Sequence, residues 1–426
     1  MVRRTRTILF FICVFLVALI SPLVVFYCQG YRFDFNSKEI TKTGGLFLDV
    51  EPKQVEIYID NELVKKTDPF FGSALIDNLL PKKYKVEVKK DGYFSWKKFL
   101  EVKEKEVSEA KNVILFPKDQ KFTVLTKSTE NFWISPDKRK IILKEVTEKS
   151  WALKLYDLDK KVKSHLISET DISQKGADLM NLEFSPDSKE IYLDVGTKEQ
   201  EKNFSLRLDK TPPTLVKRVI TEEKIPIENV IAYQKFGNEI YYLDNLGYLF
   251  RTDPYWNFGV KINEVPYPAK QETEYKIKKF SDFIFLQESQ DIYLFNPDLK
   301  FFVKFFEGAN DIIFSPDEKK LVYFSDSEIW ILFLRDIPTQ PQRKTGEKLL
   351  LIKSNEKINN VFWLNSDYLI FSEGDKIEIS EIDDRDKINI VDLAEYKNPN
   401  ISFNDNDKKL YFLSEGNFYS SDVLIP

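Results

Sequence analysis

The chain has 426 residues, enough for two or three domains with sizeable cores. The chain has a single histidine, which excludes a His-rich zinc site. Its two cysteines both lie within an N-terminal apolar run, so disulfides and Cys-ligated metals are excluded in the rest of the chain. The net charge is −5 and the first 28 residues carry +3, so the remainder is −8, with Lys and Arg spread evenly and no pattern that indicates nucleic-acid binding.

Residues 8–28 form an apolar run long enough to cross a bilayer as one helix. Three arginines precede it without an acidic residue, so the positive-inside rule places residues 1–7 in the cytoplasm and the rest of the chain outside the cell. A cleaved signal peptide is the alternative. The run is longer than a typical signal core, however, and ends in Phe-Tyr-Cys without a small-x-small site. We therefore expect an uncleaved, single-pass signal anchor in the cell membrane.

Residues 29–43 are expected to be a short tether, and residues 44–117 a compact β module. Alternating apolar segments bounded by Pro, Asn, Asp and Gly are typical of a small, half-buried antiparallel sheet. The predicted strands are residues 46–50, 55–59, 84–88, 99–102 and 112–116.

Several motifs of this module stand in a characteristic order. They are Gly44-Gly45, Pro52, Asp60-Asn61, the stretch 79–88 and Asp91-Gly92-Tyr93. In this order and spacing the module resembles the PEGA domain over about 75 residues, with departures at 53–55 and 82–83. The resemblance implies an extracytoplasmic β-sandwich of surface-layer and envelope proteins, without catalytic residues.

A Ser-Pro-Asp phrase occurs three times, at residues 135–137, 185–187 and 315–317. Each copy follows an apolar residue and precedes one or two lysines and a new apolar run. Because Pro fixes φ for the second position of a tight turn and Asp can bond the turn backbone, each copy predicts a β-hairpin. Weaker copies raise the count to seven units: residues 231–242, 277–285, 362–371 and 403–412.

Units of about 35–50 residues have room for four short strands, which is the size of a propeller blade. The hairpins resemble those of TolB-type, WD-repeat-like propellers, whose turn normally reads Pro-Asp-Gly. Lys138, Ser188 and Glu318 stand where Gly is usual, and we expect a type I turn to accept them.

Residues 118–426 are thus predicted to form a seven-bladed propeller, within a range of six to eight blades. The last unit ends early, and residues 121–125 are expected to supply its outer strand and close the ring. Turns between third and fourth strands are expected at 156–160, 206–210 and 295–299. The predicted fold class is mainly β: a transmembrane helix, a PEGA-like sandwich and a propeller. The join near 117–121 has little apolar sequence, so the two modules are expected to fold separately.

Few residues are candidates for chemistry. His165 lies in a polar stretch and is expected at the surface, and residues 404–407 lack the Gly and Glu of a calcium loop, so they are expected to be a degenerate repeat turn. Trp96 is a candidate exposed contact for sugar or protein. Three other tryptophans are expected to pack between blades: Trp133, Trp330 and Trp363. The sequence has no nucleophile elbow, phosphate loop or dinucleotide fingerprint, so we assign no catalytic, cofactor-binding or metal-binding residue.

The sequence therefore predicts a monomeric, non-catalytic binding or scaffold protein of the bacterial cell envelope. Its expected partner is an envelope protein or a cell-wall glycan. The alternative is a carboxylate-dependent hydrolase of glycan or peptide at the propeller mouth, because propellers can carry glycosidase sites. With 68 acidic residues in the chain, no carboxylate pair stands out.

Overall fold

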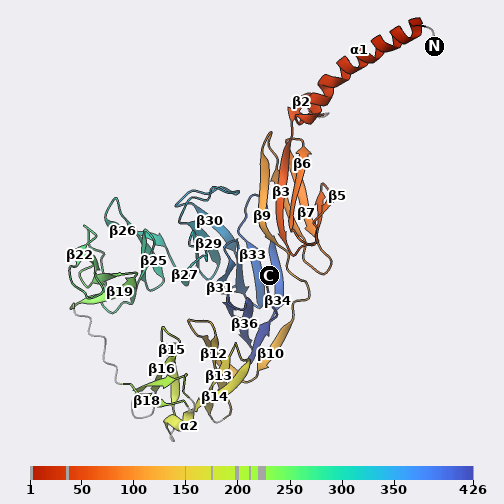
Figure 1. Ribbon diagram of the computed structural model, residues 1–426. Helices are drawn as coiled ribbons and strands as arrows, with labels where there is room; N and C mark the ends of the chain where they lie inside the picture. Colours follow the sequence, from red (N-terminus) through yellow and green to blue (C-terminus); the bar gives the residue numbers. More distant parts are fainter. Residues whose placement is uncertain are drawn as a thin grey trace.

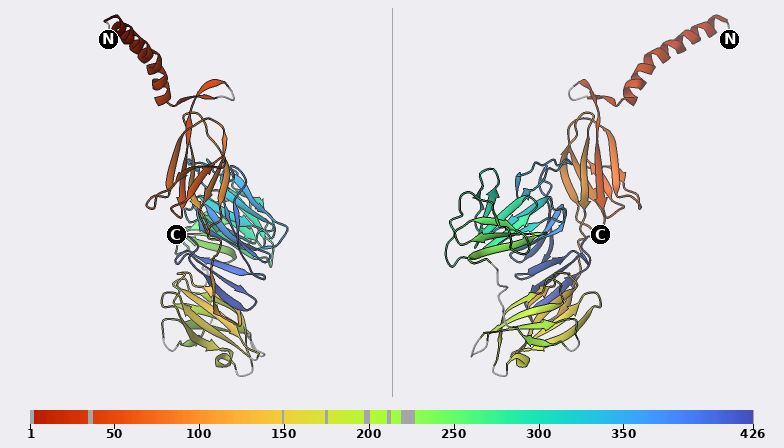
Figure 2. Two further views of the ribbon diagram at one scale, coloured as in Figure 1. Left: turned by 90° about the vertical axis from the view of Figure 1, so that its right-hand side faces the viewer. Right: turned by 60° about the vertical axis from the view of Figure 1, so that its left-hand side comes forward.

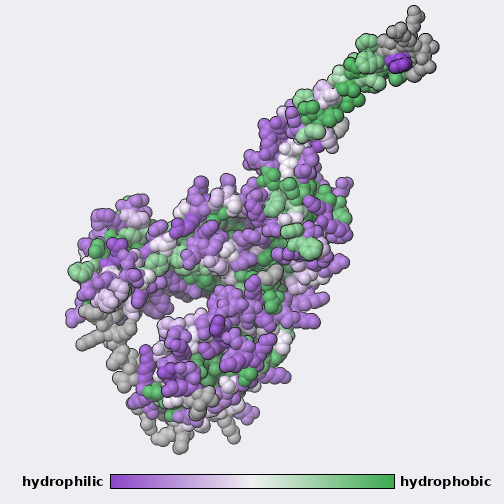
Figure 3. Space-filling view, viewed as in Figure 1, coloured by the Kyte–Doolittle hydropathy of each residue, from purple (hydrophilic) through white to green (hydrophobic). Residues whose placement is uncertain are grey.

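The computed structural model describes residues 3–34, 38–148, 150–173, 176–196, 201–210, 213–218 and 227–425. Within these residues one long helix leads into a small two-sheet module and then into a series of four-stranded sheets (Figure 1). The helix α1 (Arg3–Cys28) projects from one end of the molecule, and Figure 3 shows it as an apolar rod beside a mostly hydrophilic surface. Its segment Leu9–Cys28 has the length and composition of a membrane span or of a signal sequence.

A two-stranded hairpin follows α1, where the sequence predicted only a tether. Its strands are β1 (Tyr31–Asp34) and β2 (Glu39–Lys42), which pair antiparallel. The hairpin lies between the end of α1 and the two-sheet module (Figure 2).

The two-sheet module consists of one sheet in the order β6-β3-β9 and a second in the order β5-β4-β7-β8. Its strands are β3 (Gly44–Glu51), β4 (Glu56–Ile59), β5 (Glu62–Lys66), β6 (Ser73–Leu79), β7 (Lys83–Lys89), β8 (Trp96–Glu101) and β9 (Val107–Ile114). Both sheets contribute to one apolar core, in which Leu48, Ile57 and Val86 have no exposed area. Strands β3 and β9 pair in parallel, so the prediction of a purely antiparallel sheet is wrong at this pair.

Glycine is required where β3 begins. A Cβ added to Gly44 would lie 2.2 Å from the carbonyl oxygen of Lys103, far inside van der Waals contact.

Seven further four-stranded antiparallel sheets, called blades 1 to 7 below, account for the rest of the described strands. Blade 1 comprises β11 (Thr129–Ile134), β12 (Lys140–Val146), β13 (Trp151–Asp157) and β14 (Val162–Ser168), followed by the short helix α2 (Glu169–Ile172). Blade 2 comprises β15 (Asp178–Phe184), β16 (Glu190–Gly196), β17 (Glu201–Arg207) and β18 (Leu215–Lys217). Blade 3 comprises β19 (Val230–Phe236), β20 (Glu239–Asp244), β21 (Leu249–Thr252) and β22 (Val260–Lys261).

The remaining blades follow the same pattern. Blade 4 comprises β23 (Tyr275–Phe280), β24 (Phe283–Glu288), β25 (Asp291–Asn296) and β26 (Phe301–Phe306). Blade 5 comprises β27 (Asp311–Phe314), β28 (Lys320–Phe324), β29 (Glu328–Phe333) and β30 (Lys348–Lys353). Blade 6 comprises β31 (Ile358–Asn365), β32 (Tyr368–Glu373), β33 (Lys376–Glu381) and β34 (Ile390–Glu395). Blade 7 joins β35 (Asn400–Asn404), β36 (Lys409–Ser414) and β37 (Asn417–Ser421) to β10 (Phe122–Thr126).

Strand β10 completes blade 7 from the start of the propeller sequence. It pairs antiparallel with β37, with Phe122 opposite Ser421 and Val124 opposite Tyr419. This confirms the predicted outer strand at 121–125. The Ser-Pro-Asp hairpins join the first and second strands of their blades, and the three turns expected between third and fourth strands are also present.

Neighbouring blades are held together by shared apolar clusters. Such clusters join blades 1 and 2, 3 and 4, 4 and 5, 5 and 6, 6 and 7, and 7 and 1. Trp133, Trp330 and Trp363 belong to them, as expected. Among the described residues no cluster joins blade 2 to blade 3, and the two blades lie apart in the views of Figures 1 and 2. Within the described residues, the ring of contacts is therefore interrupted between blades 2 and 3.

The Ser-Pro-Asp turns share one geometry. In blade 5, Ser315 Oγ donates to Asp317 Oδ1 at 2.6 Å. Asp317 Oδ1 also accepts the backbone N–H of Lys319 at 3.2 Å. The next residue, Glu318, has φ of +57°, and Lys138 and Ser188 match it at +56° and +58°. The expectation that the turn accepts these residues agrees with the hydrogen bond from the fourth residue to the first, as from the N–H of Glu318 to the carbonyl of Ser315 at 2.9 Å. The sequence did not predict that this fourth residue adopts a left-handed conformation that favours glycine.

Two other sequence expectations agree with the fold. Residues 404–407 form the equivalent turn of blade 7, in which Asp407 Oδ1 accepts the N–H of Lys409 at 3.2 Å and Lys408 has φ of +57°. This confirms the degenerate repeat turn. His165 is exposed on β14.

Replacing Asp317 with alanine removes the acceptor of the turn and the partner of the buried Lys320 Nζ, which lies 2.8 Å away. We expect the free energy of unfolding to fall by about 0.5–2 kcal/mol, as for a lost side-chain cap. Burial raises the pKa of Asp317, but hydrogen bonds from Lys320 and Ser315 outweigh burial and lower it. A carboxyl whose pKa is lowered by folding contributes stability at pH values above its unfolded-state pKa. This contribution is lost as pH falls through the folded-state pKa.

The difference between wild type and Asp317→Ala should therefore be full at neutral pH and shrink in acid, which urea unfolding at several pH values measures. Asp187→Ala is the matched control, because its carboxylate is more exposed and lies 3.7 Å from Lys189. Equal losses of unfolding free energy in the two variants would show that the ion pair with the buried Lys320 adds nothing to stability.

Candidate functional site

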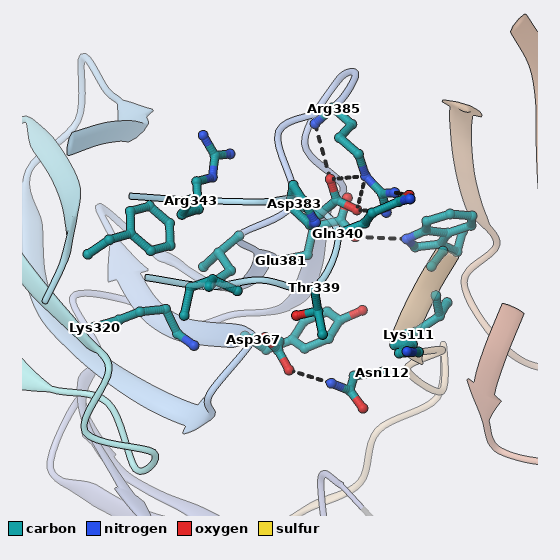
Figure 4. Close-up of a pocket in the computed structure, with 18 residues that line it drawn as sticks. Lys111, Asn112, Lys320, Thr339, Gln340, Arg343, Asp367, Glu381, Asp383 and Arg385 are labelled. Carbon is teal, nitrogen blue, oxygen red and sulfur yellow. Dashed lines mark hydrogen bonds and ion pairs between the residues drawn. The ribbon is translucent and has the colours of Figure 1, made fainter. Parts of the chain in front are cut away.

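A pocket of about 220 Å³ lies where the two-sheet module meets blades 5 and 6 (Figure 4). The module contributes Trp96 and Asn112, blade 5 contributes Lys320, and blade 6 contributes Asp367 and residues 381–385. Charged groups from three distant parts of the sequence therefore converge at this junction.

A buried lysine fastens the module to blade 6 beside the pocket. Lys98 on β8 has no exposed side-chain area, and its Nζ lies 2.6 Å from Glu381 Oε1. The other oxygen of Glu381 accepts the indole N–H of Trp96 at 2.7 Å, and Asn389 Nδ2 donates to Oε1 at 2.7 Å. These partners offset the cost of removing both charges from water. Trp96 is 3% exposed, so the expectation of an exposed aromatic contact there is wrong.

Arg385 extends this arrangement to the carboxylate of Asp383. Its Nε and Nη2 donate to the two carboxylate oxygens at 3.0 and 2.6 Å, and its Nη1 donates to the carbonyl of Glu109 on β9 at 2.6 Å. Burial raises the pKa of Asp383, but Arg385 and the charge of Lys98 outweigh burial and lower it. Lys98, Glu381, Asp383 and Arg385 are called the clamp below.

Asp367 faces the pocket from the turn between β31 and β32, where its Oδ2 accepts a hydrogen bond from Asn112 Nδ2 at 2.8 Å (Figure 4). Burial raises the pKa of Asp367, and the opposing effects of Lys320 and Asn112 do not cancel it. The pKa values of Asp367 and Asp383, two carboxyls of one pocket, are therefore shifted in opposite directions.

Arg343 contributes a donor that is not used within the protein. Its Nη1 lies 2.5 Å from Glu347 Oε1 and its Nη2 bonds Asp384, whereas its Nε is buried without a hydrogen-bond partner in the described part of the chain. A buried donor without an acceptor is costly. An acceptor oxygen brought into the pocket beside this group would relieve that cost.

The pocket offers polar recognition and a pair of unlike carboxyls, but no metal-binding constellation. Within the described ranges, no group of three or more His, Cys, Asp or Glu side chains could hold a metal ion. Of the charged side chains that line the pocket, three belong to the clamp, Glu381, Asp383 and Arg385, and their first role is to join the module to blade 6.

Sequence reasoning assigned no catalytic, cofactor-binding or metal-binding residue, and of this pocket it singled out only Trp96, as an exposed contact. One signal was present: Trp96, Lys98 and Leu100 share the buried face of β8, where a lysine requires a partner. The charges at 381–387 resemble an ordinary solvated loop, because their partners lie in the module and cannot be recognised locally.

A second feature is an aromatic surface on blade 3, defined by Tyr233, Tyr242, Phe250, Tyr255, Trp256 and Phe258. Tyr241 and Leu243 of β20 pack toward blade 4. The alternating residue Tyr242 therefore belongs to the opposite face, where its ring stacks on Phe250 at 5.0 Å between centroids and meets Trp256 at 5.5 Å. Among the described residues, no blade shares a cluster with this face.

The loop 253–259 carries the exposed part of the aromatic surface in a strained conformation. Trp256 has φ of +64° and Phe258 has φ of +57°, values that are rare for bulky residues. Tyr255 is 80% and Phe258 89% exposed. Asp253 Oδ1 holds the loop by accepting two of its backbone N–H groups, at 3.1 and 2.7 Å. Strain that is held in place in this way is typical of functional loops.

No family model and no curated protein matches the chain. Similar solved structures include YCF48 from Cyanidioschyzon merolae, with 10% identity and a TM-score of 0.40 over 71% of this chain and 98% of that one. Oligogalacturonate lyase in complex with manganese has 14% identity and a TM-score of 0.41, over 73% and 96% of the two chains. Virginiamycin B lyase from Staphylococcus aureus has 14% and 0.40, over 72% and 99%. At these TM-scores nothing about function is drawn from them, and the propeller assignment rests on strand topology.

Lys98→Met leaves Glu381 and Asp383 without their buried cation. We expect the free energy of unfolding to fall by about 3–5 kcal/mol, as for other broken buried pairs. Lys97→Met on the same strand is the matched control, because Lys97 is exposed and its partner Glu87 keeps a second lysine, Lys89, at 3.2 Å, so we expect a loss of less than about 1 kcal/mol. Chemical denaturation measures both, and Lys98→Met combined with Glu381→Gln should recover part of the loss. Equal effects of the two single variants would contradict the clamp.

Asp367→Asn tests the raised pKa of this carboxyl. A raised folded-state pKa means that wild type loses stability as pH rises from the unfolded-state pKa through the folded-state pKa. Asparagine keeps an oxygen for Asn112 and cannot ionise, so the melting temperature of the variant should exceed that of wild type near pH 8, with the difference vanishing near pH 3. Asp383→Asn is the control, because the pKa of Asp383 is lowered, and its melting temperature near pH 8 should be below that of wild type. A melting temperature of Asp367→Asn below wild type near pH 8 would contradict the assignment.

Proposed function

We propose that the chain is a membrane-anchored, extracytoplasmic binding or scaffold protein of the bacterial cell envelope, without catalytic activity. The span at Leu9–Cys28 and the arginines before it support a single-pass anchor with the bulk of the chain outside. Two small sheets with the motif order of a PEGA domain support a PEGA-like sandwich between anchor and propeller.

The aromatic surface of blade 3 is the observation that carries the binding role. Exposed aromatic side chains are the residues that most often dominate recognition. The loop 253–259 carries two of them, Tyr255 and Phe258, and has a left-handed backbone at Trp256 and Phe258. The partner contacted by this surface is an envelope protein or a cell-wall glycan.

The clamp supports the scaffold aspect of the proposal. Because Lys98 and Arg385 join the module to blade 6 through paired charges, the blades are held in one orientation on the anchored module. A partner bound at blade 3 would thus be held at a defined place relative to the membrane.

Tyr255→Ala combined with Phe258→Ala should weaken partner binding by at least about tenfold, as expected for aromatic hot spots. The matched control is Leu299→Ala combined with Val303→Ala, which removes exposed apolar groups from blade 4. Two assays separate the partner classes: capture from detergent-solubilised envelope followed by mass spectrometry, and co-sedimentation with purified cell wall. Melting temperatures should stay unchanged. Undiminished binding in both assays, or equal losses in the control, would contradict the proposal.

A carboxylate-dependent hydrolase of glycan or peptide is the second candidate. The opposite pKa shifts of Asp367 and Asp383 in one pocket favour it, since an acid and a base of one site commonly differ in this way. Turnover of a glycan or peptide panel by wild type that is lost in both Asp→Asn variants would establish this activity. Stability effects without turnover would leave Asp383 in its clamp role and Asp367 in its hydrogen bond with Asn112.

A further inference from the structure

The hairpin between α1 and the two-sheet module is too small to be stable by itself. It has two strands of four residues each, and an isolated two-stranded hairpin is marginal in water without a surface to pack on. If the hairpin packs on a further surface, we therefore expect one of its two faces to be apolar.

Register divides the hairpin into a polar and an apolar face. The polar face carries Arg32, Asp34, Glu39 and Thr41, and the apolar face carries Tyr31, Phe33, Ile40 and Lys42. Phe33 and Ile40 lie directly opposite each other and are 47% and 68% exposed. Large apolar side chains on one face of so short an element indicate a contact surface.

Both faces contact the end of α1, and the polar face is also bonded to the module. Arg32 of the polar face donates from Nη2 to Asn78 Oδ1 of the module at 2.9 Å. The ring of Tyr31, on the apolar face, meets Phe26 of α1 edge-on at 5.4 Å. The apolar face is therefore the one turned from the module and continuous with the end of the span.

The residues around this point are those of a membrane interface. Tyr27 and Tyr31 place two aromatic rings at the end of α1, and the Arg32 guanidinium lies 3.5 Å from the centroid of the Tyr27 ring. Tyrosine is enriched at the headgroup level, and basic side chains there reach lipid phosphates. The Lys42 ammonium, 4.8 Å from the ring of Tyr31, adds a second cation on the apolar face.

We propose that the hairpin lies in the headgroup layer of the membrane, with Tyr31, Phe33 and Ile40 toward the acyl chains and Lys42 toward phosphate. This rests on the proposed membrane anchoring and adds to it a second, peripheral contact. A helix alone leaves the module free to swivel about its end. The hairpin, tied to both α1 and the module through Arg32, sets the angle of the module to the bilayer.

Spin labels on the full chain in phospholipid nanodiscs test this contact. The background is Cys13→Ser with Cys28→Ser, because these are the only cysteines. Single cysteines replace Ile40 on the apolar face and Glu39, the adjacent exposed residue of the polar face. Val17→Cys reports the middle of the span, and Leu246→Cys reports an exposed site on blade 3. Collision with dissolved oxygen and with a water-soluble nickel chelate is measured at each site.

The label at Ile40 should collide with oxygen several-fold more, and with the nickel chelate several-fold less, than the label at Glu39. Equal nickel accessibility at Ile40, Glu39 and Leu246, with Val17 still shielded, would overturn the hairpin contact and leave the anchor standing. Nickel accessibility at Val17 would overturn the anchor and the hairpin contact together.

Discussion

The ammonium group of Lys98 is out of contact with water and 2.6 Å from Glu381. Two charges buried this way add little net stability, because the attraction between them is largely spent on desolvation, but they tolerate only a narrow range of geometries. The apolar side of the same junction supplies adhesion: Phe116 is 2% exposed and meets Tyr368 edge-on at 5.6 Å. Orientation and adhesion between the module and blade 6 thus come from different residues.

The blades show a similar division of roles around the interruption between blades 2 and 3. Turns of adjacent blades are linked on one side: Asn406 Nδ2 donates to the carbonyl of Asp137 at 2.8 Å, and the N–H of Asp137 donates to Ser188 Oγ at 3.0 Å. These bonds run from blade 7 through blade 1 to blade 2. Blade 3 instead packs only toward blade 4 within the described residues, and its opposite face is left to the aromatic surface.

Local patterns predicted the features that depend on local physics. The Ser-Pro-Asp repeats, the strand count of the blades and the strand at 121–125 follow from turn chemistry and alternation, and all are observed. The parallel pairing of β3 with β9 escaped prediction because alternation is the same for either strand direction. The left-handed conformation of Glu318 escaped because a β-turn by itself does not fix the backbone of its fourth residue.

The candidate site was not predictable by the same means. Lys98 and Trp96 look like a surface cation and an exposed ring until Glu381 is brought beside them. The contacts between the module and blade 6 come from Phe116 and the clamp, whereas the join at 117–121, from which separate folding was predicted, has little apolar sequence. The strained aromatics at 256 and 258 carry no local mark, because no glycine announces their backbone conformation.

Strand β10 has a consequence for the order of events during synthesis. It emerges about 290 residues before its partner β37, and at about 5–20 residues per second the delay is about 15–60 s. Throughout this interval its backbone has no β37 to pair with, a situation that invites pairing with other chains. Lys121 and Lys127 at its two ends supply charge that opposes such pairing. Blade 7 is completed last, when the first strand of the propeller, β10, pairs with the last strand, β37. Because β37 is also paired with β36, neither end of the propeller sequence can fray without breaking the hydrogen bonds of this sheet.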